Sequence, residues 1–420
     1  MNKIKKTIIQ LSRQAKRASE NLALIDTSIK NTLLRKMAHA LLVKRIYIEK
    51  ENEKDIALAQ KEGHSKAVID RLVLNEKRIK EMAQCLLDTA ALKDPVGEVL
   101  ATFKRPNGLL IKKVRVPIGV IGIIYESRPN VTSDCIGLCL KSANAVILKG
   151  GKEAFYSNQA IFKIMRDVLK GSKIPPEAIQ LVPFVEREAV EILLQQEDLI
   201  DVIIPRGGEG LIRFVTEHSR IPVIKHYKGV CHTYVSERAD LEMARWICFN
   251  AKVERPATCN AMETLLVHRK VAKRFLPPMI NDFQKAGVEI RGCPLTRSIV
   301  KTGIKKAFES DWYEEYLDLI LAVKVVNNFE EAISHITRYG SKHSDCIVTQ
   351  DPQEAEKFLN AVDSACVYQN ASTRFTDGYE FGFGAEIGIS TDKLHARGPM
   401  ALEELTTYKY KVYGQGQVRT

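Results

Sequence analysis

The sequence predicts an α/β fold built on a parallel, doubly wound sheet. Apolar segments of strand length alternate with helix-like segments from residue 118 to residue 205, and this alternation is typical of a parallel sheet covered by helices. Residues 118–125 are almost all apolar, which indicates a strand buried on both faces. The chain has 420 residues, more than one core usually supports, so we expect two or three domains. The alternation resumes after residue 270, which is consistent with a second α/β domain.

Residues 1–98 are expected to be helical. Apolar side chains recur there at intervals of three and four residues, which is the period of one helix face. Asp94 and Pro95, followed by Gly97, end this region. We expect no chemistry from it and expect its many lysines to form a solvated face.

The ends of the predicted strands carry residues of interest. The strands are expected at 118–125, 145–149, 180–185 and 201–205, and ligands of parallel sheets bind at the carboxyl ends of strands. Lys149 ends the second segment, and Arg206, Gly207 and Gly208 follow the fourth. Bare glycines let backbone N–H groups approach a phosphate, and a helix that begins near Glu209 adds its positive end. A tight turn without a ligand is the alternative for the two glycines.

Residues 103–117 are expected to form a β-hairpin. Asn107-Gly108 is a strong turn signal, because both residues of a tight hairpin turn must accept positive φ. An isolated hairpin is marginally stable, so we expect a partner strand. Residues 407–413 alternate polar and larger apolar side chains and are the expected partner. A surface hairpin on a monomer is the alternative.

The composition limits the classes of partner. The net charge of +12 permits nucleic acid, an anionic membrane or small anionic ligands. The lysines are spread along the chain and no basic motif with interleaved aromatic residues occurs, so we expect neither nucleic acid nor membrane as a partner. The nine cysteines are odd in number and show no metal-like CxxC pair, so we expect neither disulfides nor a metal site. No apolar run reaches the length of a signal or membrane segment, and we expect a cytoplasmic protein.

Cys259 lies in the most informative stretch of the chain. A helical pattern that includes Leu241 and Ala251 is stopped by Pro256, and an apolar run of strand length follows at residues 265–267. Cys259 is therefore expected in a turn between a helix and a strand. A thiolate there could attack an acyl carbon. A buried, inert cysteine is the alternative.

The sequence around Cys259 resembles a known active-site segment. Residues 255–268 read RPATCNAMETLLVH, and this string resembles the nucleophile segment of the γ-glutamyl phosphate reductases, or glutamate-5-semialdehyde dehydrogenases, a branch of the aldehyde dehydrogenase superfamily. Residues 366–375, 381–391 and 395–400 also resemble this family, and the resemblance extends over nearly the whole chain. It implies an aldehyde dehydrogenase-like fold, with two doubly wound α/β domains and a β-hairpin oligomerisation arm.

The resemblance also implies a division of the chain. The NADPH-binding domain is expected at residues 1–102 and 118–225, and the catalytic domain at 226–400. The oligomerisation arm is expected at residues 103–117 and 401–420.

The resemblance assigns roles to several residues. Cys259 is the expected nucleophile, and the Asn130 side chain with the Cys259 backbone N–H is expected to stabilise the oxyanion. The alternative for Asn130 is a helix cap. Lys149, Arg206, Gly207 and Gly208 are expected to hold the dinucleotide, and Arg206 beside a 2′-phosphate favours NADPH over NADH.

Further residues are expected around the substrate. Glu315 resembles the residue that holds the nicotinamide ribose, with a plain surface glutamate as the alternative. Arg374 and Arg397 are candidates to bind phosphate or the α-carboxylate, with structural ion pairs as the alternative, and Asn370 is a further candidate for substrate binding. Where hydrolytic relatives carry a glutamate that activates water, this chain has His226 and no carboxylate.

The implied activity is the NADPH-dependent reduction of L-glutamate 5-phosphate to the semialdehyde in proline biosynthesis. A homo-oligomer, dimer or tetramer, and functional coupling to a glutamate kinase are expected with it. Two alternatives are an aldehyde dehydrogenase that forms a free acid and a basic nucleic-acid-binding protein on an inactive enzyme fold. The missing carboxylate argues against the first, and the intact Cys259 segment argues against the second.

Overall fold

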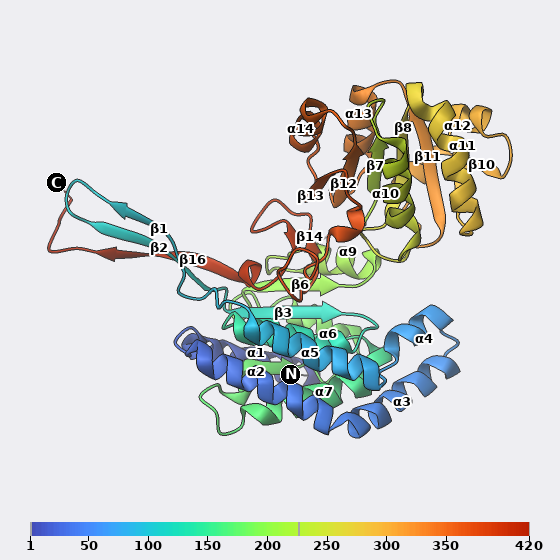
Figure 1. The fold of residues 1–420 in the computed structure, drawn as a ribbon. Coiled ribbons are helices and arrows are strands. Elements are labelled where there is room, and N and C mark those ends of the chain that lie inside the picture. The colour runs from blue at the N-terminus through green and yellow to red at the C-terminus, as the bar shows by residue number, and fades with distance from the viewer. Residues whose placement is uncertain (1, 226, 420) are drawn as a thin grey trace. The chain divides into compact units, whose positions relative to one another are not determined.

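The computed structural model describes residues 2–225 and 227–419 and divides into two compact units (Figure 1). The first unit comprises Met1–Lys225, Gly382–Gly388 and Met400–Thr420, and the second comprises His226–Phe381 and Ile389–Pro399. The expected domain boundary after residue 225 coincides with a unit boundary. Residues 382–388, however, belong to the first unit and not with the rest of the expected catalytic range.

Helices form the N-terminal part of the first unit, as the periodicity predicted. They are α1 (Lys3–Leu22), α2 (Thr27–Val43), α3 (Arg45–Lys61), α4 (Lys66–Leu72) and α5 (Glu76–Ala91). Helix α1 buries Ile8, Ala15 and Leu22, three members of one apolar stripe. Asn2 caps its first turn by accepting a hydrogen bond from the Ile4 N–H.

A parallel sheet forms the core of the first unit. Its strand order is β5-β4-β3-β6, with β3 (Val120–Tyr125), β4 (Ala145–Gly150), β5 (Ile179–Leu181) and β6 (Val202–Arg206). The helices between and after these strands are α6 (Asn130–Lys141), α7 (Phe155–Leu169), α8 (Arg187–Leu193) and α9 (Glu209–His218). Every residue of β3 is buried, as its apolar sequence predicted. The strand order reverses beside β3, and such a point is where ligands of open α/β sheets bind.

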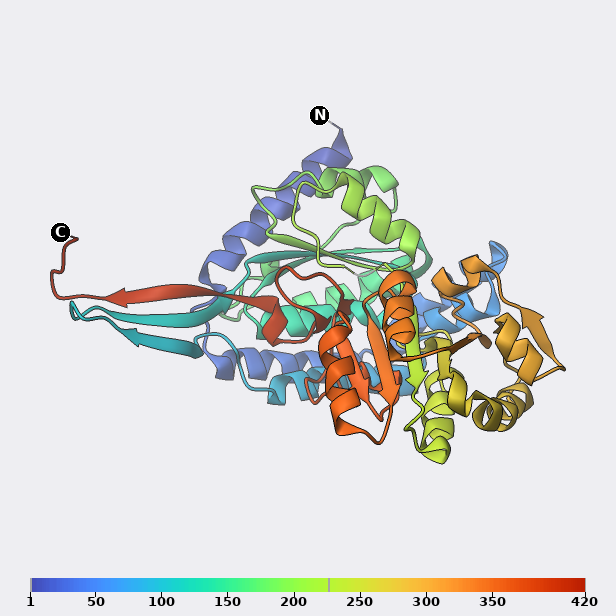
Figure 2. The same cartoon turned by 90° about the horizontal axis from the view of Figure 1, so that it is seen from above.

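An antiparallel sheet extends from the first unit (Figures 1 and 2). It has the order β1-β2-β16, with β1 (Val99–Lys104), β2 (Leu110–Pro117) and β16 (Thr406–Tyr413). The hairpin and its pairing with the C-terminal strand are as the sequence predicted, although β1 begins at Val99, before the expected start at residue 103. Gly108 has φ of 88°, but Asn107 does not have positive φ, so the expectation of positive φ at both residues was wrong. The Gly108 N–H donates to the Arg105 carbonyl over 2.9 Å, which places Pro106 and Asn107 at the centre of the turn. The oligomerisation role of this arm stays a prediction.

The second unit is built on a longer parallel sheet with the order β10-β9-β11-β8-β7-β12-β13. Its strands are β7 (Cys231–Val235), β8 (Met262–His268), β9 (Glu289–Gly292), β10 (Ile304–Lys306), β11 (Ile320–Val326), β12 (Ser344–Val348) and β13 (Cys366–Gln369). The helices are α10 (Leu241–Val253), α11 (Arg269–Lys285), α12 (Pro294–Ile299), α13 (Phe329–Tyr339) and α14 (Pro352–Ala361), and β14 (Ile389–Ser390) pairs with β15 (Gly398–Pro399). This is the second α/β domain that the sequence predicted.

The core of the second unit lies on both faces of this sheet. On one face, Leu265 of β8 packs with Phe275 and Phe283 of α11. On the other, Leu266 packs with Tyr234 and Phe358. Strand β8 is buried throughout, so the cysteine turn that precedes it is anchored at its C-terminal end. Within the described ranges, none of the helices combines the length and apolar character needed to cross a membrane.

Candidate active site

Cys259 lies in the turn between α10 and β8, where the sequence placed it. It is partly exposed, whereas the other eight cysteines, all in the described part of the chain, are buried. Burial raises the pKa of several of these thiols, including Cys231 and Cys248, and so keeps them protonated. An accessible thiol in a turn is the arrangement that nucleophilic catalysis needs, and it argues against the buried, inert alternative.

The backbone of Cys259 is fixed by the segment that leads into β7. The Cys231 thiol donates to the Cys259 carbonyl over 3.2 Å. Gly229 lies so close that a Cβ added to it would meet the Cys259 carbonyl oxygen and stand 2.5 Å from the Cys259 Cα. Only glycine fits this approach without a backbone shift, because real Cβ atoms are not found so close to a backbone.

Glu315 lies next to the Gly229 backbone that packs against Cys259. Its Oε1 accepts a hydrogen bond from the Gly229 N–H over 2.9 Å. The structure therefore joins Cys259, Gly229 and Glu315 at the amino ends of β7, β8 and β11. This hydrogen bond distinguishes Glu315 from a plain surface glutamate, and its role toward a cofactor ribose stays a prediction.

Arg374 binds the residues on either side of the cysteine. Its Nη1 donates to Thr258 Oγ1 over 2.9 Å and also to Asn260 Oδ1, while its Nε lies 3.3 Å from a Glu254 carboxylate oxygen. The Asn260 amide nitrogen in turn donates to the carbonyls of Arg374 and Thr376, at 3.2 and 3.0 Å. The structure thus brings Arg374 to the cysteine turn, as part of the framework that holds it.

A buried ion pair joins the two elements that flank the cysteine turn, and it was missed from the sequence. Lys252 of α10 and Glu263 of β8 approach to 2.6 Å with no exposure of either side chain. Glu263 also accepts from the Leu317 N–H at 3.3 Å, which ties the Glu315 segment to β8. Burial raises the pKa of Glu263 to about 8 and lowers that of Lys252. A carboxylate inside the apolar run of residues 261–267 is the signal that could have found this pair.

Asn370 lies at the opposite edge of the sheet from the cysteine turn, and the hydrogen bonds of Arg397 go to Asp363. Asn370 follows β13 at the carboxyl end of the sheet, whereas Cys259 precedes β8 at the amino end. The Asn370 side chain bonds the backbone N–H and carbonyl of Thr349, at 3.0 and 2.9 Å. The Arg397 guanidinium donates to the Asp363 carboxylate over 2.8 Å and to the Asp363 carbonyl over 3.0 Å. In this structure Arg397 takes the structural ion-pair alternative.

Asn130 begins α6 just beyond the carboxyl end of β3 in the first unit. Its amide nitrogen donates to Asp134 Oδ2 over 2.9 Å, and it does not cap the helix, because the N-cap position is Pro129. An amide nitrogen carries two hydrogens, so this bond orients the side chain and leaves a second donor. His226, at the position where hydrolytic relatives carry a base, lies outside the described residues.

The expected dinucleotide residues lie at the carboxyl ends of β4 and β6. Lys149 is 5% exposed, its Nζ donates to the Gly150 carbonyl at 2.9 Å, and burial lowers its pKa. Arg206 ends β6, and its Nη1 donates to the carbonyls of Glu386 and Ile387. In this structure the Arg206 guanidinium therefore holds the segment 382–388 against the sheet.

The turn of Gly207 and Gly208 faces a carboxylate. The Gly208 N–H donates to Glu126 Oε2 over 3.0 Å. A Cβ on Gly207 would stand 2.8 Å from the Glu126 carboxyl carbon and 2.8 Å from Leu211, whereas a Cβ on Gly208 would meet only a Glu126 oxygen at 4.0 Å. Burial raises the pKa of Glu126. An anionic group already occupies the N-terminal end of α9, which is the position a phosphate would take.

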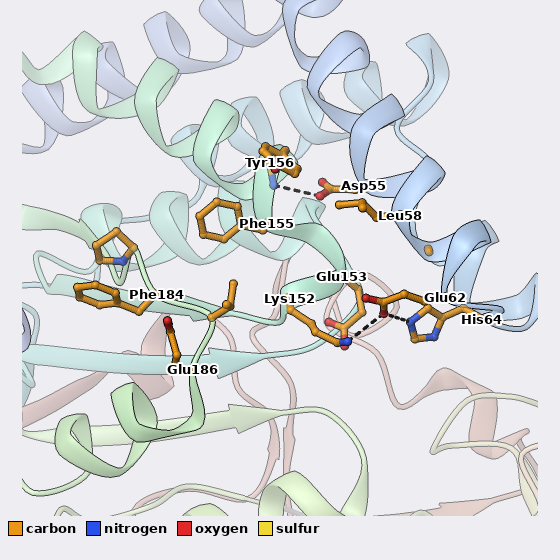
Figure 3. A pocket seen from close by; sticks show the side chains of 13 residues that line it. Asp55, Leu58, Glu62, His64, Lys152, Glu153, Phe155, Tyr156, Phe184 and Glu186 are labelled. Atoms are coloured by element: carbon orange, nitrogen blue, oxygen red, sulfur yellow. Dashed lines mark hydrogen bonds and ion pairs between the residues drawn. The ribbon is translucent and has the colours of Figure 1, made fainter. Parts of the chain in front are cut away.

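A cavity of about 380 Å³ opens beside the carboxyl ends of β4 and β5 in the first unit (Figure 3). Its lining includes Phe155 and Phe184. It also includes Lys152 and Glu62, whose Nζ and Oε2 atoms lie 2.9 Å apart in an ion pair. Asp55 closes one side by accepting from the Tyr156 N–H at 3.1 Å. Asp55, Glu62, Glu153 and Glu186 also line the cavity, so carboxylates outnumber the one lysine and the lining gives no support for a phosphate group there.

Comparisons with known proteins agree with this geometry. A model of the aldehyde dehydrogenase family matches residues 2–298. The gamma-glutamyl phosphate reductase of Thermodesulfovibrio yellowstonii is 56% identical and is matched over 99% of this chain and 99% of its own length. That of Nautilia profundicola is 55% identical, over 98% of this chain and 99% of its own.

Solved structures lead to the same family. The crystal structure of the gamma-glutamyl phosphate reductase from Thermotoga maritima covers 98% of this chain and 100% of its own, with a TM-score of 0.96 and 47% identity. That of the Saccharomyces cerevisiae enzyme covers 98% of each chain, with a TM-score of 0.54 and 32% identity. The chain therefore belongs to the aldehyde dehydrogenase family, in its branch of gamma-glutamyl phosphate reductases.

Proposed function

We propose that this chain reduces L-glutamate 5-phosphate to L-glutamate 5-semialdehyde and phosphate, with NADPH as the reductant, in proline biosynthesis. The observation that carries this proposal is the accessible Cys259 turn in a chain 56% identical over nearly its whole length to a gamma-glutamyl phosphate reductase. The enzyme is thus a glutamate-5-semialdehyde dehydrogenase of the phosphorylating kind.

The first step forms a thioester. The Cys259 thiolate attacks the γ-carbonyl carbon of the acyl phosphate, the carbonyl electrons move to oxygen, and their return expels phosphate. The transient oxyanion needs fixed donors. The Asn130 amide and the Cys259 backbone N–H are proposed for this role, and the bond from Asn130 to Asp134 supports it by orienting the amide.

The second step releases the aldehyde. A bound reduced nicotinamide supplies a hydride to the thioester carbon. Cys259 then leaves as the thiolate when the hemithioacetal collapses, and the same two donors stabilise the second oxyanion. Glutamate 5-semialdehyde departs and cyclises without the enzyme to pyrroline-5-carboxylate.

The residues of the first unit fit a dinucleotide. A Cβ on Gly207 would clash with Glu126 and Leu211, so the backbone approaches these side chains closely. The Gly208 N–H donates to the Glu126 carboxylate, and the Lys149 side chain is buried. Glu315 is proposed to hold the nicotinamide ribose. For NADPH in preference to NADH, Arg206 remains the proposed partner of the 2′-phosphate, and it must release its carbonyl partners to take that role.

Substrate binding remains a proposal at three positions. Arg374 lies at the cysteine turn, which supports a place near the substrate. Asn370 and Arg397 have their own protein partners in this structure, so a role for either requires a rearrangement. A substrate KM measured for alanine variants of all three would rank them.

A homo-oligomer is proposed to form through the arm. Seven consecutive residues of β16, from Thr407 to Tyr413, are exposed, and Tyr408, Tyr410 and Val412 are each about half exposed. An edge strand with exposed apolar side chains favours association. Dimer and tetramer are both open, and coupling to a glutamate kinase is proposed because an acyl phosphate needs a kinase to make it. Light scattering of a variant that ends at residue 405 would test the arm.

The reverse reaction tests the proposed function. Purified protein is mixed with pyrroline-5-carboxylate and NADP⁺, and NADPH absorbance is followed with and without inorganic phosphate. Continuous NADPH formation that requires phosphate is the expected result. Continuous formation without phosphate means hydrolysis to a free acid and contradicts the proposal. No formation by a folded protein means another acyl substrate.

A further inference from the structure

We infer that Arg374 is a positioning residue for Cys259: it holds both neighbours of the cysteine and keeps a fixed positive charge beside the thiolate. This inference rests on the proposed nucleophilic role of Cys259. It assigns Arg374 a task different from binding the substrate phosphate or α-carboxylate.

The guanidinium holds the turn on both sides of the cysteine. Nη1 donates to Thr258 Oγ1 over 2.9 Å and to the Asn260 side-chain oxygen. The Thr258 hydroxyl is itself bonded to the Arg255 carbonyl at 2.8 Å, so the chain before the cysteine is closed on itself. One nitrogen thus restrains positions i−1 and i+1 of the nucleophile.

The chain around Arg374 returns these bonds. The Asn260 amide nitrogen donates to the carbonyls of Arg374 and Thr376, and Thr373 Oγ1 donates to the Asn260 carbonyl over 2.7 Å. The 3-10 helix Thr373–Phe375 and the cysteine turn are therefore joined by bonds in both directions. The Arg374 side chain is 12% exposed, so solvent screens its charge only weakly.

Several other ionisable groups among the described residues lie near the turn. Glu254 lies 3.3 Å from the Arg374 Nε but is about half exposed, which weakens its effect. Lys252 is paired with Glu263 at 2.6 Å. Arg255 belongs to the turn, where its carbonyl accepts from Thr258, and Cys231, His343 and Glu315 are further ionisable groups near it. Arg374 is the cation in direct contact with both neighbours of Cys259.

Alkylation of the free protein separates positioning from substrate binding. Iodoacetamide modification of Cys259 is followed by mass spectrometry from pH 6 to pH 9, and the burial of the other cysteines makes this thiol the selective target. For Arg374→Gln we expect the midpoint of the alkylation profile to rise by about one pH unit and the rate at neutral pH to fall about tenfold. Arg374→Lys should restore most of the midpoint.

Matched variants control for charge and for folding. Arg245→Gln removes a guanidinium that pairs with Asp282 on the α10–α11 side of the same unit, and it should leave the profile unchanged. Thr258→Val removes one Arg374 contact without changing charge, and we expect a smaller loss of rate, of about threefold. If Arg374→Gln does not fold, Thr258→Val decides the question: an alkylation rate equal to that of the wild type contradicts the inference, because Arg374→Lys is expected close to the wild type.

A different result would contradict the inference. If the alkylation rate of Arg374→Gln stays within twofold of the wild-type rate and its substrate KM is raised, Arg374 binds substrate and does not position the thiol. The alkylation assay contains no substrate, so it also stands if the enzyme acts on another acyl compound. Failure of the proposed function would appear only in the reverse reaction.

Discussion

The cysteine turn of the second unit and the glycine turn of the first unit are held in opposite ways. A Cβ on Gly229 would stand 2.5 Å from the Cys259 Cα, and Arg374 and Cys231 bind the same turn. A Cβ on Gly208 would find only a carboxylate oxygen at 4.0 Å. The cysteine turn is packed against backbone at Gly229, whereas the glycine turn faces only side chains, those of Glu126 and Leu211.

This difference matches two kinds of chemistry. A nucleophile must be within a narrow range of positions when it attacks, because small displacements of reacting atoms cost large factors in rate. A phosphate-binding turn needs exposed N–H groups and room for a ligand to displace what is there. In the glycine turn, the Gly208 N–H donates to the Glu126 carboxylate, and binding of a phosphate there stays a prediction.

The largest effect is expected at the cysteine itself. Cys259→Ala removes the only accessible thiol in the described chain and should abolish turnover. NADPH binding, measured by fluorescence titration, should stay close to that of the wild type. Retained turnover would refute the thioester route.

Asn130→Ala tests the proposed oxyanion role of this amide. We expect kcat to fall by roughly 10²–10³, because one oxyanion donor is lost while the thiol remains. Steady-state kinetics at saturating substrate measures this. A change below threefold would remove Asn130 from the oxyanion hole.

Gly229→Ala and Gly208→Ala compare the two turns directly. In the cysteine turn the new methyl group must displace backbone, so kcat should fall about 100-fold even if the protein folds. In the glycine turn the methyl group has room, and kcat should change little, with any loss appearing as weaker NADPH binding. Equal losses of kcat in both variants would show that the two turns do not differ in this way.

Arg206→Ala should have a smaller and selective effect. If its guanidinium pairs with the 2′-phosphate, NADPH binding weakens about tenfold while NADH binding hardly changes. Titration with both cofactors measures the difference. Equal weakening would place Arg206 away from the 2′-phosphate and leave it the role of holding Glu386 and Ile387.

The smallest effect is expected at Asp363, which has no proposed role in either turn. Bonds from Lys393 and Arg397 lower its pKa from 3.8 to about 2. A lowered carboxyl pKa stabilises the folded state above pH 4, and this contribution is lost as the pH falls from about 4 to about 2. Because the group is exposed, Asp363→Asn should cost less than about 1 kcal/mol at pH 7.

Thermal unfolding of the wild type and Asp363→Asn at several pH values measures this contribution. The gap between the two melting temperatures should close as the pH approaches 2. A gap that does not depend on pH would show that the bonds of Asp363 do not depend on its charge.

The sequence predicted what depends on neighbouring residues. Alternating apolar and helical segments indicated the α/β fold, and Pro256 between a helical pattern and an apolar run placed Cys259 in its turn. The Asn107-Gly108 signal located the hairpin. These features follow from short-range backbone preferences, which a single sequence contains.

The sequence could not predict contacts between distant residues. Arg374 binds Thr258 and Asn260, which are 116 and 114 positions away, and a guanidinium can bind a turn or a substrate with the same geometry. Asn370 was expected near substrate, but its backbone has φ of 54° and its amide holds Thr349. Residues 382–388 belong to the first unit through contacts, such as those with Arg206, that no local pattern shows.

A burst experiment tests the central claim, that the fixed Cys259 carries the acyl group between two half-reactions. The protein is mixed with pyrroline-5-carboxylate and NADP⁺ in buffer without phosphate, and NADPH and the mass of the Cys259 peptide are measured together. The thioester route predicts that about one NADPH forms per active site and that a glutamyl group stays on Cys259. When phosphate is added, the glutamyl group should leave Cys259 and NADPH formation should become continuous. Steady NADPH formation with an unmodified Cys259 would contradict it.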